Sequence, residues 1–460
     1  MPEKMPDIGS IHTLTPHDLS LSGGSVAKLA GITVFLDKGL PEEILEARIT
    51  AHAPRFMRAE VVRRIQPSPH ETPSFCSYGG VCGGCAFPTL AYGKELAWKE
   101  RQVKETLCRI GHVSFDGESE FLPIIPSPAP LAYRNKVEFA FGFAENLPAL
   151  GLRQKNSREI VSIADCPLCA MPLASILSAV RAWLRDSSLS PWDGQNGYLR
   201  FLVVRCPTLM DDGAPQCLVE CITAPGGADM AQKITELGEL LMQTTPITGF
   251  VHSLRRAKEN VAYGEKTVTS LGKTVIAEQF GHVLLHAPVQ AFLQINTGAA
   301  SLLYEQLARY ADREHTATIW DIYSGVGSMA LYLAKEGRAI RGMESTTEAV
   351  NFANKNVASL PQNRGDVAFI RYDANKALNK LTPTPDLVIT DPPRGGLAKE
   401  TIKTLRAINP ARIIAIGCDT ANLARDLALF QPAYQVRSAR AVDMFPHTPH
   451  VETIALLARQ

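Results

Sequence analysis

The sequence lacks any apolar run long enough to cross a membrane, which takes about 20 consecutive residues. Residues 1–10 also lack the basic stretch and apolar core of a secretory signal. We find no internal repeat and no low-complexity tract. The formal net charge is only +1, so bulk charge neither supports nor excludes a nucleic-acid partner. These absences predict a cytoplasmic protein without a membrane partner, and we expect a monomer.

The chain of 460 residues is too long for one ordinary hydrophobic core, so two or three domains are expected. Its ten cysteines come without a secretory signal, which predicts a reducing compartment. In such a compartment, clustered cysteines more often bind metal or do chemistry than form disulfides.

Residues 7–66 alternate short apolar runs with glycines, a pattern that predicts a small β module. Its C-terminal strands carry five arginines against the single Glu60. These are Arg48, Arg55, Arg58, Arg63 and Arg64. Two interpretations stay open: a solvated face, or the phosphate-facing edge of a small barrel.

Residues 67–284 begin with a proline-rich linker and a cysteine-rich loop. A charged amphipathic helix is predicted over 92–110, and the sequence over 120–280 is typical of β-strands for the most part. We predict that this range forms a β-rich central domain. Residues 285–460 alternate apolar strands with helical patterns, which predicts an α/β domain with a mostly parallel sheet covered on both faces.

A predicted strand over 319–323 runs into the glycine loop 324–328, and Glu344 follows Gly325 by 19 residues at the end of the next strand. Glycines let the backbone approach a ligand, and a carboxylate in that position can hold the hydroxyls of a ribose. A structural tight turn is the plain alternative. The spacing of Gly325, Gly327 and Ala330 also fits NAD-binding proteins, so a dehydrogenase is a rival interpretation.

The feature that separates these rivals is Asp-Pro-Pro-Arg at 391–394, after the apolar strand 387–390. An acid followed by two prolines shapes the target site of class I methyltransferases. Arg394 stands where amine methyltransferases carry an aromatic residue, which argues against transfer to an exocyclic amine. Alternatively, the two prolines only end a strand.

Cys418 follows the apolar strand 413–416, at the end where parallel sheets bind ligands, although a buried core cysteine is the common alternative. Glu452 closes the stiff polar segment 445–452, in which His447 and His450 have no evident third metal ligand. A thiolate that adds to carbon 6 of uracil activates carbon 5, and a carboxylate can then remove the carbon-5 proton.

Together these motifs resemble the RNA 5-methyluridine methyltransferase family, from about Asp18 to the C-terminus. The likeness is greatest to the 23S ribosomal RNA (uracil-5-)-methyltransferases, which have a TRAM domain and an iron–sulfur cluster. It extends to residues 292–296, 391–394, 423–427 and 446–452, the last being highly specific.

The resemblance implies RNA methylation at uridine carbon 5 with S-adenosylmethionine, most similar to the enzymes of ribosomal RNA. Cys418 would be the nucleophile and Glu452 the base. The implied cofactor contacts are Gln294, Tyr323, Glu344 and Asp391. The N-terminal module would be an RNA-binding TRAM barrel, and the C-terminal domain a Rossmann-like class I methyltransferase.

Two motifs depart from the family pattern. Residues 417–420 are Gly-Cys-Asp-Thr where the family has Ser-Cys-Asn-Pro, and residues 323–325 are Tyr-Ser-Gly where it has Phe-Cys-Gly. The first change sets a carboxylate, Asp419, beside the thiol. It bears on the reactivity of Cys418 rather than on its identity as the nucleophile.

Cysteines at 76, 82 and 85 have a spacing close to that of ferredoxin-like thiolate ligands. A zinc site is the alternative, with Cys82 and Cys85 paired with Cys166 and Cys169. The resemblance implies a [4Fe–4S] cluster on Cys76, Cys82, Cys85 and Cys166. We expect its role to be structural or RNA-binding, because methyl transfer needs no electron.

Three rival functions accompany this interpretation. Transfer RNA is the main rival substrate within the family. An NAD-dependent oxidoreductase would use the same glycine loop but would leave Cys418 and Glu452 unexplained. A non-catalytic iron–sulfur RNA-binding protein would result if Asp419 had disabled the site.

Overall fold

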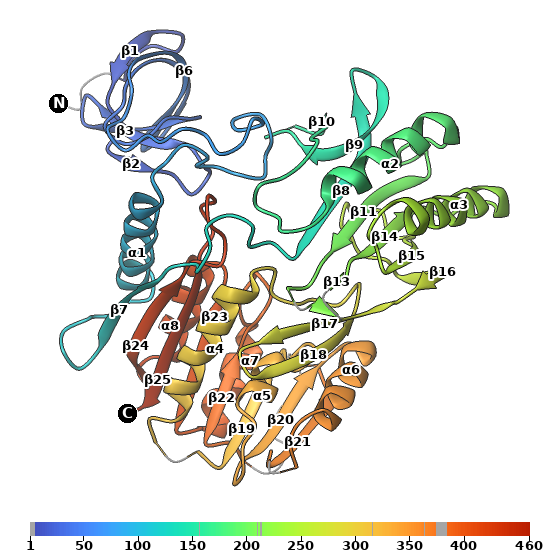
Figure 1. Cartoon of the computed structure of the whole chain (residues 1–460). Coiled ribbons are helices and arrows are strands. Elements are labelled where there is room, and N and C mark those ends of the chain that lie inside the picture. The colour runs from blue at the N-terminus through green and yellow to red at the C-terminus, as the bar shows by residue number, and fades with distance from the viewer. Residues whose placement is uncertain are drawn as a thin grey trace.

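The computed structural model describes residues 5–155, 157–208, 210–211, 214–314, 316–362, 364–373 and 384–460. Figure 1 shows an N-terminal β module, a central region with one curved sheet, and a C-terminal α/β region with helices on both faces of its sheet. This architecture confirms the predicted fold class. No helix in the described ranges has the length and apolarity to cross a membrane.

Within the described residues, the N-terminal module is one sheet of six strands in the order β1-β5-β6-β4-β3-β2, which curls into a small barrel (Figure 1). Its strands are β1 (Ile11–Leu14), β2 (Asp18–Leu19), β3 (Ser25–Leu29), β4 (Ile32–Leu36), β5 (Ile44–Ala53) and β6 (Phe56–Gln66). Every second residue of β5 and β6 points inward, as Leu45, Ala47 and Ile49 do. Register shifts between β5 and β6 increase the curvature of the sheet.

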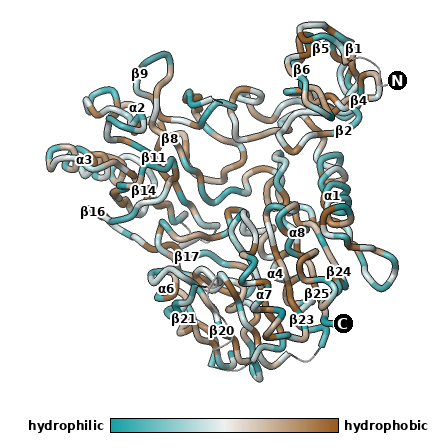
Figure 2. Tube along the Cα trace, turned by 180° about the vertical axis from the view of Figure 1, so that it is seen from behind, coloured by the Kyte–Doolittle hydropathy of each residue, from teal (hydrophilic) through white to brown (hydrophobic). Residues whose placement is uncertain are grey.

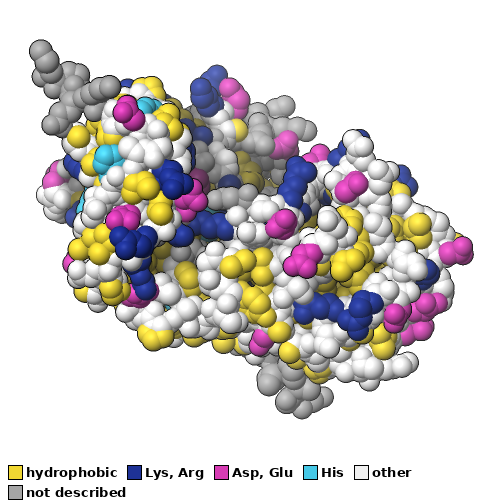
Figure 3. Space-filling view, turned by 90° about the horizontal axis from the view of Figure 1, so that it is seen from above, with side chains coloured by type: hydrophobic (Ala, Val, Ile, Leu, Met, Phe, Trp, Pro, Cys, Tyr) yellow, Lys and Arg dark blue, Asp and Glu magenta, His cyan; other side chains and the backbone are white. Residues whose placement is uncertain are grey.

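The arginines of this module do not form a uniformly free basic edge. Arg63 is paired with Glu46 across the strands at 2.9 Å, and Arg64 contacts Glu71 at 2.7 Å. Seen from above, basic and acidic side chains are interspersed over the visible face (Figure 3). Part of the positive charge of these arginines is therefore offset within the protein, and the phosphate-facing interpretation stays a prediction.

The central sheet has seven strands in the described residues, in the order β10-β9-β8-β11-β14-β15-β16. These are β8 (Lys136–Ala144), β9 (Leu147–Arg153), β10 (Ile160–Val161), β11 (Leu199–Arg205), β14 (Leu218–Thr223), β15 (Gly249–Leu254) and β16 (Lys266–Gly272). Two hairpins accompany it, β12 (Met210–Asp211) with β13 (Ala214–Pro215), and β17 (Val275–Phe280) with β18 (Val283–Pro288).

Two helices that the sequence analysis missed cover the central sheet: α2 (Leu173–Ser187) and α3 (Ala228–Thr244). The inner face of α2 carries Leu173, Ile176, Leu177, Val180 and Leu184, which is a helical period. These residues share one core with strands β8, β11 and β14. The signal for α2 was therefore present in a range assigned as mostly β.

The C-terminal sheet has eight strands in the described residues, in the order β21-β20-β19-β22-β23-β25-β24-β7. They are β7 (Glu120–Ile125), β19 (Thr318–Ile322), β20 (Ala339–Glu344), β21 (Asp366–Arg371), β22 (Leu387–Thr390), β23 (Arg412–Gly417), β24 (Tyr434–Val442) and β25 (Glu452–Arg459). Strands β19 to β23 run parallel, and β25 pairs antiparallel with β23 and β24. Strands β22 and β23 are buried along their whole length, as expected for a sheet covered on both sides.

Helices cover both faces of this sheet, as Figure 2 shows from behind. One face packs on α4 (Thr297–Ala311), α5 (Ser328–Tyr332) and α6 (Thr347–Ala358). The other packs on α1 (Tyr92–Arg109), α7 (Lys399–Ile408) and α8 (Thr420–Phe430). Within one strand, Ile319 faces the first core and Trp320 the second, which is the alternation of a pleated strand.

The C-terminal sheet takes two elements from the range predicted for the central domain. Strand β7 pairs parallel with β24 at the sheet edge, and α1 packs on α8. Helix α1 also contacts the N-terminal module, because Asp18 pairs with Arg101 at 2.5 Å and accepts from Gln102 at 3.3 Å. Figures 1 and 2 both show α1 between the barrel and the C-terminal sheet.

Candidate active site

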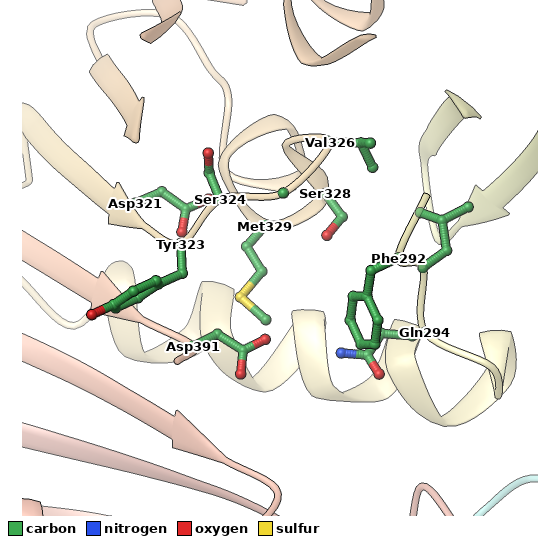
Figure 4. A pocket seen from close by; sticks show the side chains of 11 residues that line it. Phe292, Gln294, Asp321, Tyr323, Ser324, Val326, Ser328, Met329 and Asp391 are labelled. Atoms are coloured by element: carbon green, nitrogen blue, oxygen red, sulfur yellow. The ribbon is translucent and has the colours of Figure 1, made fainter. Parts of the chain in front are cut away.

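A pocket lies at the carboxyl ends of β19 and β22, next to the glycine loop. Its lining residues are Phe292, Leu293, Gln294, Asp321, Tyr323, Ser324, Gly325, Val326, Ser328, Met329 and Asp391. Figure 4 shows Phe292 and Gln294 on one side of this space and Tyr323 and Asp391 on the other. Three of the four predicted cofactor residues, Gln294, Tyr323 and Asp391, therefore line one pocket.

The glycine loop needs its glycines for steric reasons. Gly325 and Gly327 have φ values of 55° and 90°, in the left-handed region that glycine tolerates. A Cβ on Gly327 would lie 2.4 Å from the ring of Phe369, so no larger residue fits without a shift. Tyr323 also has a positive φ of 68°, and such strained residues cluster at functional sites.

Glu344, the fourth predicted cofactor residue, is not among the pocket-lining residues in the described part of the chain. Its carboxylate accepts hydrogen bonds from the backbone N–H of Gly325 at 3.2 Å and of Thr346 at 2.8 Å. Glu344 therefore fixes the glycine loop. Its predicted contact with a ribose stays a prediction.

Asp321 is a pocket residue that sequence reasoning missed, although it lies in the strand that leads into the glycine loop. Burial raises its pKa to about 8, with the charges of Asp391 and Glu344 adding to the rise. Burial also raises the pKa of Asp391 to about 6. Two carboxyl groups at one pocket, Asp321 buried and Asp391 partly exposed, make it favourable for a positively charged ligand.

A second cleft adjoins the first at the ends of β22 and β23. It is lined by Pro392, Pro393, Arg394, Gly396, Ile416, Gly417, Cys418, Asp419, Asn422, Leu423 and Asp426. Burial raises the pKa of the Cys418 thiol to about 11, and the charge of Glu452 adds to this rise. The Arg394 guanidinium opposes it, so Arg394 favours the thiolate form of Cys418.

The sheet register brings Cys418 and Glu452 together. Gly417 pairs with Thr453 at the end of the β23–β25 ladder, so Cys418 and Glu452 are the next opposed residues. Glu452 is only 3% exposed, and its Oε1 has no hydrogen-bond partner among the described residues. Burial raises its pKa well above the usual range, with Asp391 adding and Arg394 opposing. A carboxylate in this environment is a stronger base than an exposed one.

Asp419, which departs from the family pattern, has a structural role. Its side chain accepts the N–H of Asn422 at 2.9 Å and caps the N-terminus of α8. The Asn422 side chain in turn donates to the backbone oxygen of Arg394 at 2.8 Å. Aspartate and asparagine are equally good N-caps, so the substitution preserves the geometry next to Cys418.

Comparison with known proteins decides the family. The family model "tRNA (Uracil-5-)-methyltransferase" matches residues 273–460. An RNA methyltransferase of Nitratidesulfovibrio vulgaris is 38% identical, covering 97% of this chain and 96% of its own. The chain belongs to the RNA (uracil-5-)-methyltransferase family. A relative from Caldanaerobacter subterraneus is 30% identical, covering 98% and 99% of the two chains.

The methyltransferase also resembles a solved structure over nearly its whole length. Pyrococcus abyssi tRNA (uracil-54, C5)-methyltransferase, crystallised with S-adenosyl-L-homocysteine, matches with a TM-score of 0.75 and 25% identity. The match covers 97% of this chain and 100% of that one. With the family established, the dehydrogenase interpretation of the glycine loop is wrong.

The predicted metal ligands of this methyltransferase share one region of the molecule. Burial raises the pKa of Cys85 to about 12, and the charges of Cys166, Cys82 and Cys76 add to this rise. The Arg134 guanidinium, just before β8, opposes it. A hydrogen bond from Cys169 lowers the pKa of Cys166 to about 7. The four thiols are therefore close enough to interact electrostatically.

These thiols do not, however, converge into a coordination shell. Within the described ranges, no three His, Cys, Asp or Glu side chains are arranged to hold a metal ion. The Cys166 thiol is hydrogen-bonded to that of Cys169, and these two cysteines are one half of the paired zinc alternative. Four thiols are suitable donors for a thiolate-bound metal, but the described residues do not bring three of them together as a metal-binding group. The [4Fe–4S] cluster stays a prediction.

Proposed function

We propose that this methyltransferase transfers a methyl group from S-adenosylmethionine to carbon 5 of a uridine in RNA. The observation that carries the proposal is the opposition of Cys418 and Glu452 across the β23–β25 ladder, beside Asp391 and Arg394. A thiol nucleophile and a buried carboxylate base are the two groups that methylation of carbon 5 requires.

Gln294, Tyr323 and Asp391 would hold the cofactor in the pocket, with Glu344 on the ribose. S-adenosylmethionine supplies a methyl group on a positively charged sulfur. The carboxyl groups of Asp321 and Asp391 support this ligand, because a nearby cation stabilises their charged forms. The neutral product would lose that attraction, which favours its release.

In the proposed reaction, the thiolate of Cys418 forms a bond to carbon 6 of the uracil. The carbon 5–carbon 6 double bond thereby becomes an enolate, and carbon 5 takes the methyl group as the carbon–sulfur bond of the donor breaks. Glu452 then removes the proton from carbon 5. The freed electron pair restores the double bond and expels Cys418 as a thiolate.

For the substrate we propose ribosomal RNA, on the resemblance to family members with a TRAM barrel and a cluster. Transfer RNA is the second candidate, because the structural neighbour from Pyrococcus abyssi is a tRNA (uracil-54, C5)-methyltransferase. Mapping 5-methyluridine in ribosomal and transfer RNA, from cells with and without the gene, separates the two. The RNA that loses the modification is the substrate.

We further propose that Cys76, Cys82, Cys85 and Cys166 hold a [4Fe–4S] cluster with a structural role. Four mutually interacting thiols and the nearby Arg134 support this site, because a guanidinium offsets the negative charge of thiolates. No step of methyl transfer passes through the cluster.

The mechanism is tested with RNA that carries 5-fluorouridine at the target. Fluorine replaces the proton that Glu452 removes, so the wild-type enzyme should be trapped in a covalent adduct that survives a denaturing gel. Cys418→Ala should give neither adduct nor product. If Cys418→Ala keeps near-normal turnover, the nucleophile lies elsewhere and the proposed function is wrong.

A further inference from the structure

The segment that leads to Glu452 is held by residues far away in the sequence. Strand β24 ends at Val442 and β25 begins at Glu452, so the residues between them form a loop at the active site, the 443–451 loop. His447 has a φ of 65° although it is not a glycine. Such a conformation costs free energy and persists only where the surroundings impose it.

Both backbone groups of His447 are fixed by the segment around α1. Its N–H donates to Glu95 at 2.8 Å, and its carbonyl oxygen accepts from Ala86 at 2.9 Å and Phe87 at 3.2 Å. Ala86 follows Cys85 directly, so backbone hydrogen bonds connect the end of the cysteine-rich loop with the 443–451 loop. The surroundings that impose the strained backbone are therefore residues 86–95.

A buried ionic network strengthens this attachment. The Lys99 ammonium lies 2.7 Å from a carboxylate oxygen of Glu95 and 2.7 Å from one of Asp443, and it donates to the carbonyl of Phe445 at 3.1 Å. All three ionic side chains have no exposed surface. Tyr92 donates to the other oxygen of Asp443 at 2.8 Å.

The network joins α1 to the first half of the 443–451 loop and to the strained residue itself. Lys99 contacts Asp443 and Phe445 on the near side of His447, while Glu95 binds the N–H of His447 itself. Charge-assisted hydrogen bonds are short and directional, so three of them to one ammonium define its position. Loss of the ammonium would release Phe445 and set two buried carboxylates against each other.

We propose that Lys99 is a positioning residue for proton removal, fixing the 443–451 loop so that Glu452 reaches carbon 5 of the methylated uridine. This inference rests on the proposed function of Glu452. Among the described residues, the polar partners of Lys99 are Glu95, Asp443 and Phe445, and none of them lines either active-site cleft. Lys99 therefore acts through the backbone of the loop. Cys418 directly follows β23, outside this loop, so we expect addition and methyl transfer not to depend on Lys99.

The test is Lys99→Met, which keeps an unbranched side chain one atom shorter and removes its charge. Full-length enzyme is given RNA tritiated at carbon 5 of uridine, and three quantities are measured: S-adenosylhomocysteine formed in a single turnover, tritium released, and covalent adduct on a denaturing gel. Methyl transfer should proceed near the wild-type rate. Tritium release should slow by about 10- to 100-fold, since misplacement by roughly 1 Å has that effect on a reacting geometry. Adduct should accumulate.

Two further variants keep the test decisive. Lys94→Met makes the same change at an exposed position of α1 and should behave as wild type. Lys99→Met/Asp443→Asn also removes one carboxylate charge, so it relieves the repulsion that could unfold the single variant. It should show the same slow tritium release, with an unchanged number of S-adenosylhomocysteine sites per chain.

The outcomes separate this inference from the proposed function. Glu452→Gln is assayed alongside and should accumulate adduct. If Glu452→Gln gives no adduct, the assigned base is wrong and the inference falls with it. If Glu452→Gln accumulates adduct while both Lys99 variants release tritium at the wild-type rate, only the inference is overturned. Equal slowing of methyl transfer and tritium release without adduct, in the folded double variant, overturns it as well.

Discussion

Replacing Glu344 with alanine should weaken cofactor binding by a predictable amount. The carboxylate accepts hydrogen bonds from the backbone N–H groups of Gly325 and Thr346. We expect it also to accept hydrogen bonds from the ribose hydroxyls of the cofactor. A hydrogen bond to a charged group contributes about 1.5–3 kcal/mol. Loss of the ribose contact therefore corresponds to about one to two decades in Kd. Glu344→Gln keeps an acceptor for Gly325 and should lose less.

Calorimetric titration with S-adenosylhomocysteine and with its 2′,3′-dideoxy analogue separates the ribose contact from the anchoring of the glycine loop. Wild-type enzyme should bind the dideoxy analogue more weakly. In Glu344→Ala the two ligands should bind almost equally, because the group that distinguishes them is gone. Glu348→Ala, an exposed glutamate in the first turn of α6, serves as the control. If Glu344→Ala still discriminates between the ligands as well as wild type does, the ribose lies elsewhere.

Three further predictions concern metal, RNA and pH. Anaerobically purified protein should contain about four irons per chain. Cys76→Ala should remove the iron, and Cys169→Ala should not. If elemental analysis finds one zinc and no iron, the paired zinc site is supported instead. RNA affinity should fall steeply with salt, because counterions are released on binding. Deletion of residues 1–66 should lower the affinity for RNA but not the affinity for the cofactor. If both affinities fall equally, the barrel is needed for folding rather than for RNA binding. Formation of the 5-fluorouridine adduct should speed up as pH rises toward about 11, the raised pKa of Cys418, because the thiolate fraction grows over that range. Arg394→Met should move this rise to higher pH, because the guanidinium lowers the pKa of Cys418, and an unmoved profile would show that Arg394 does not tune the thiol.

Local patterns were sufficient to predict the C-terminal sheet and the glycine loop at its pocket. A strand, glycine loop, helix, strand and acid follow one another within about 25 residues, and parallel strands carry their ends to one edge. Gln294, Tyr323 and Asp391, which the family resemblance implied as cofactor contacts, line one pocket. Asp321 was missed because a single acid inside a buried strand has no distinctive spacing.

Features that depend on partners distant in the sequence were not predictable in this way. The pairing of Arg63 with Glu46 follows from the strand register, and the Glu95–Lys99–Asp443 network joins residues more than 300 positions apart. Helix α2 is a different case, because its period of buried residues was visible. Neighbouring apolar stretches made the whole range resemble strands.

The position of β7 in the C-terminal sheet limits which fragments of the chain can fold and affects the order of folding during synthesis. It supplies the outer strand of the C-terminal sheet, next to β24, yet it is synthesised about 300 residues before its partner. During synthesis, β7 therefore has no partner strand until almost the entire chain has emerged from the ribosome. A fragment that starts at residue 285 would lack this strand and leave β24 as an uncovered edge, open to pairing with other chains. Such a fragment should aggregate, and adding residues 92–125 in trans should keep it soluble.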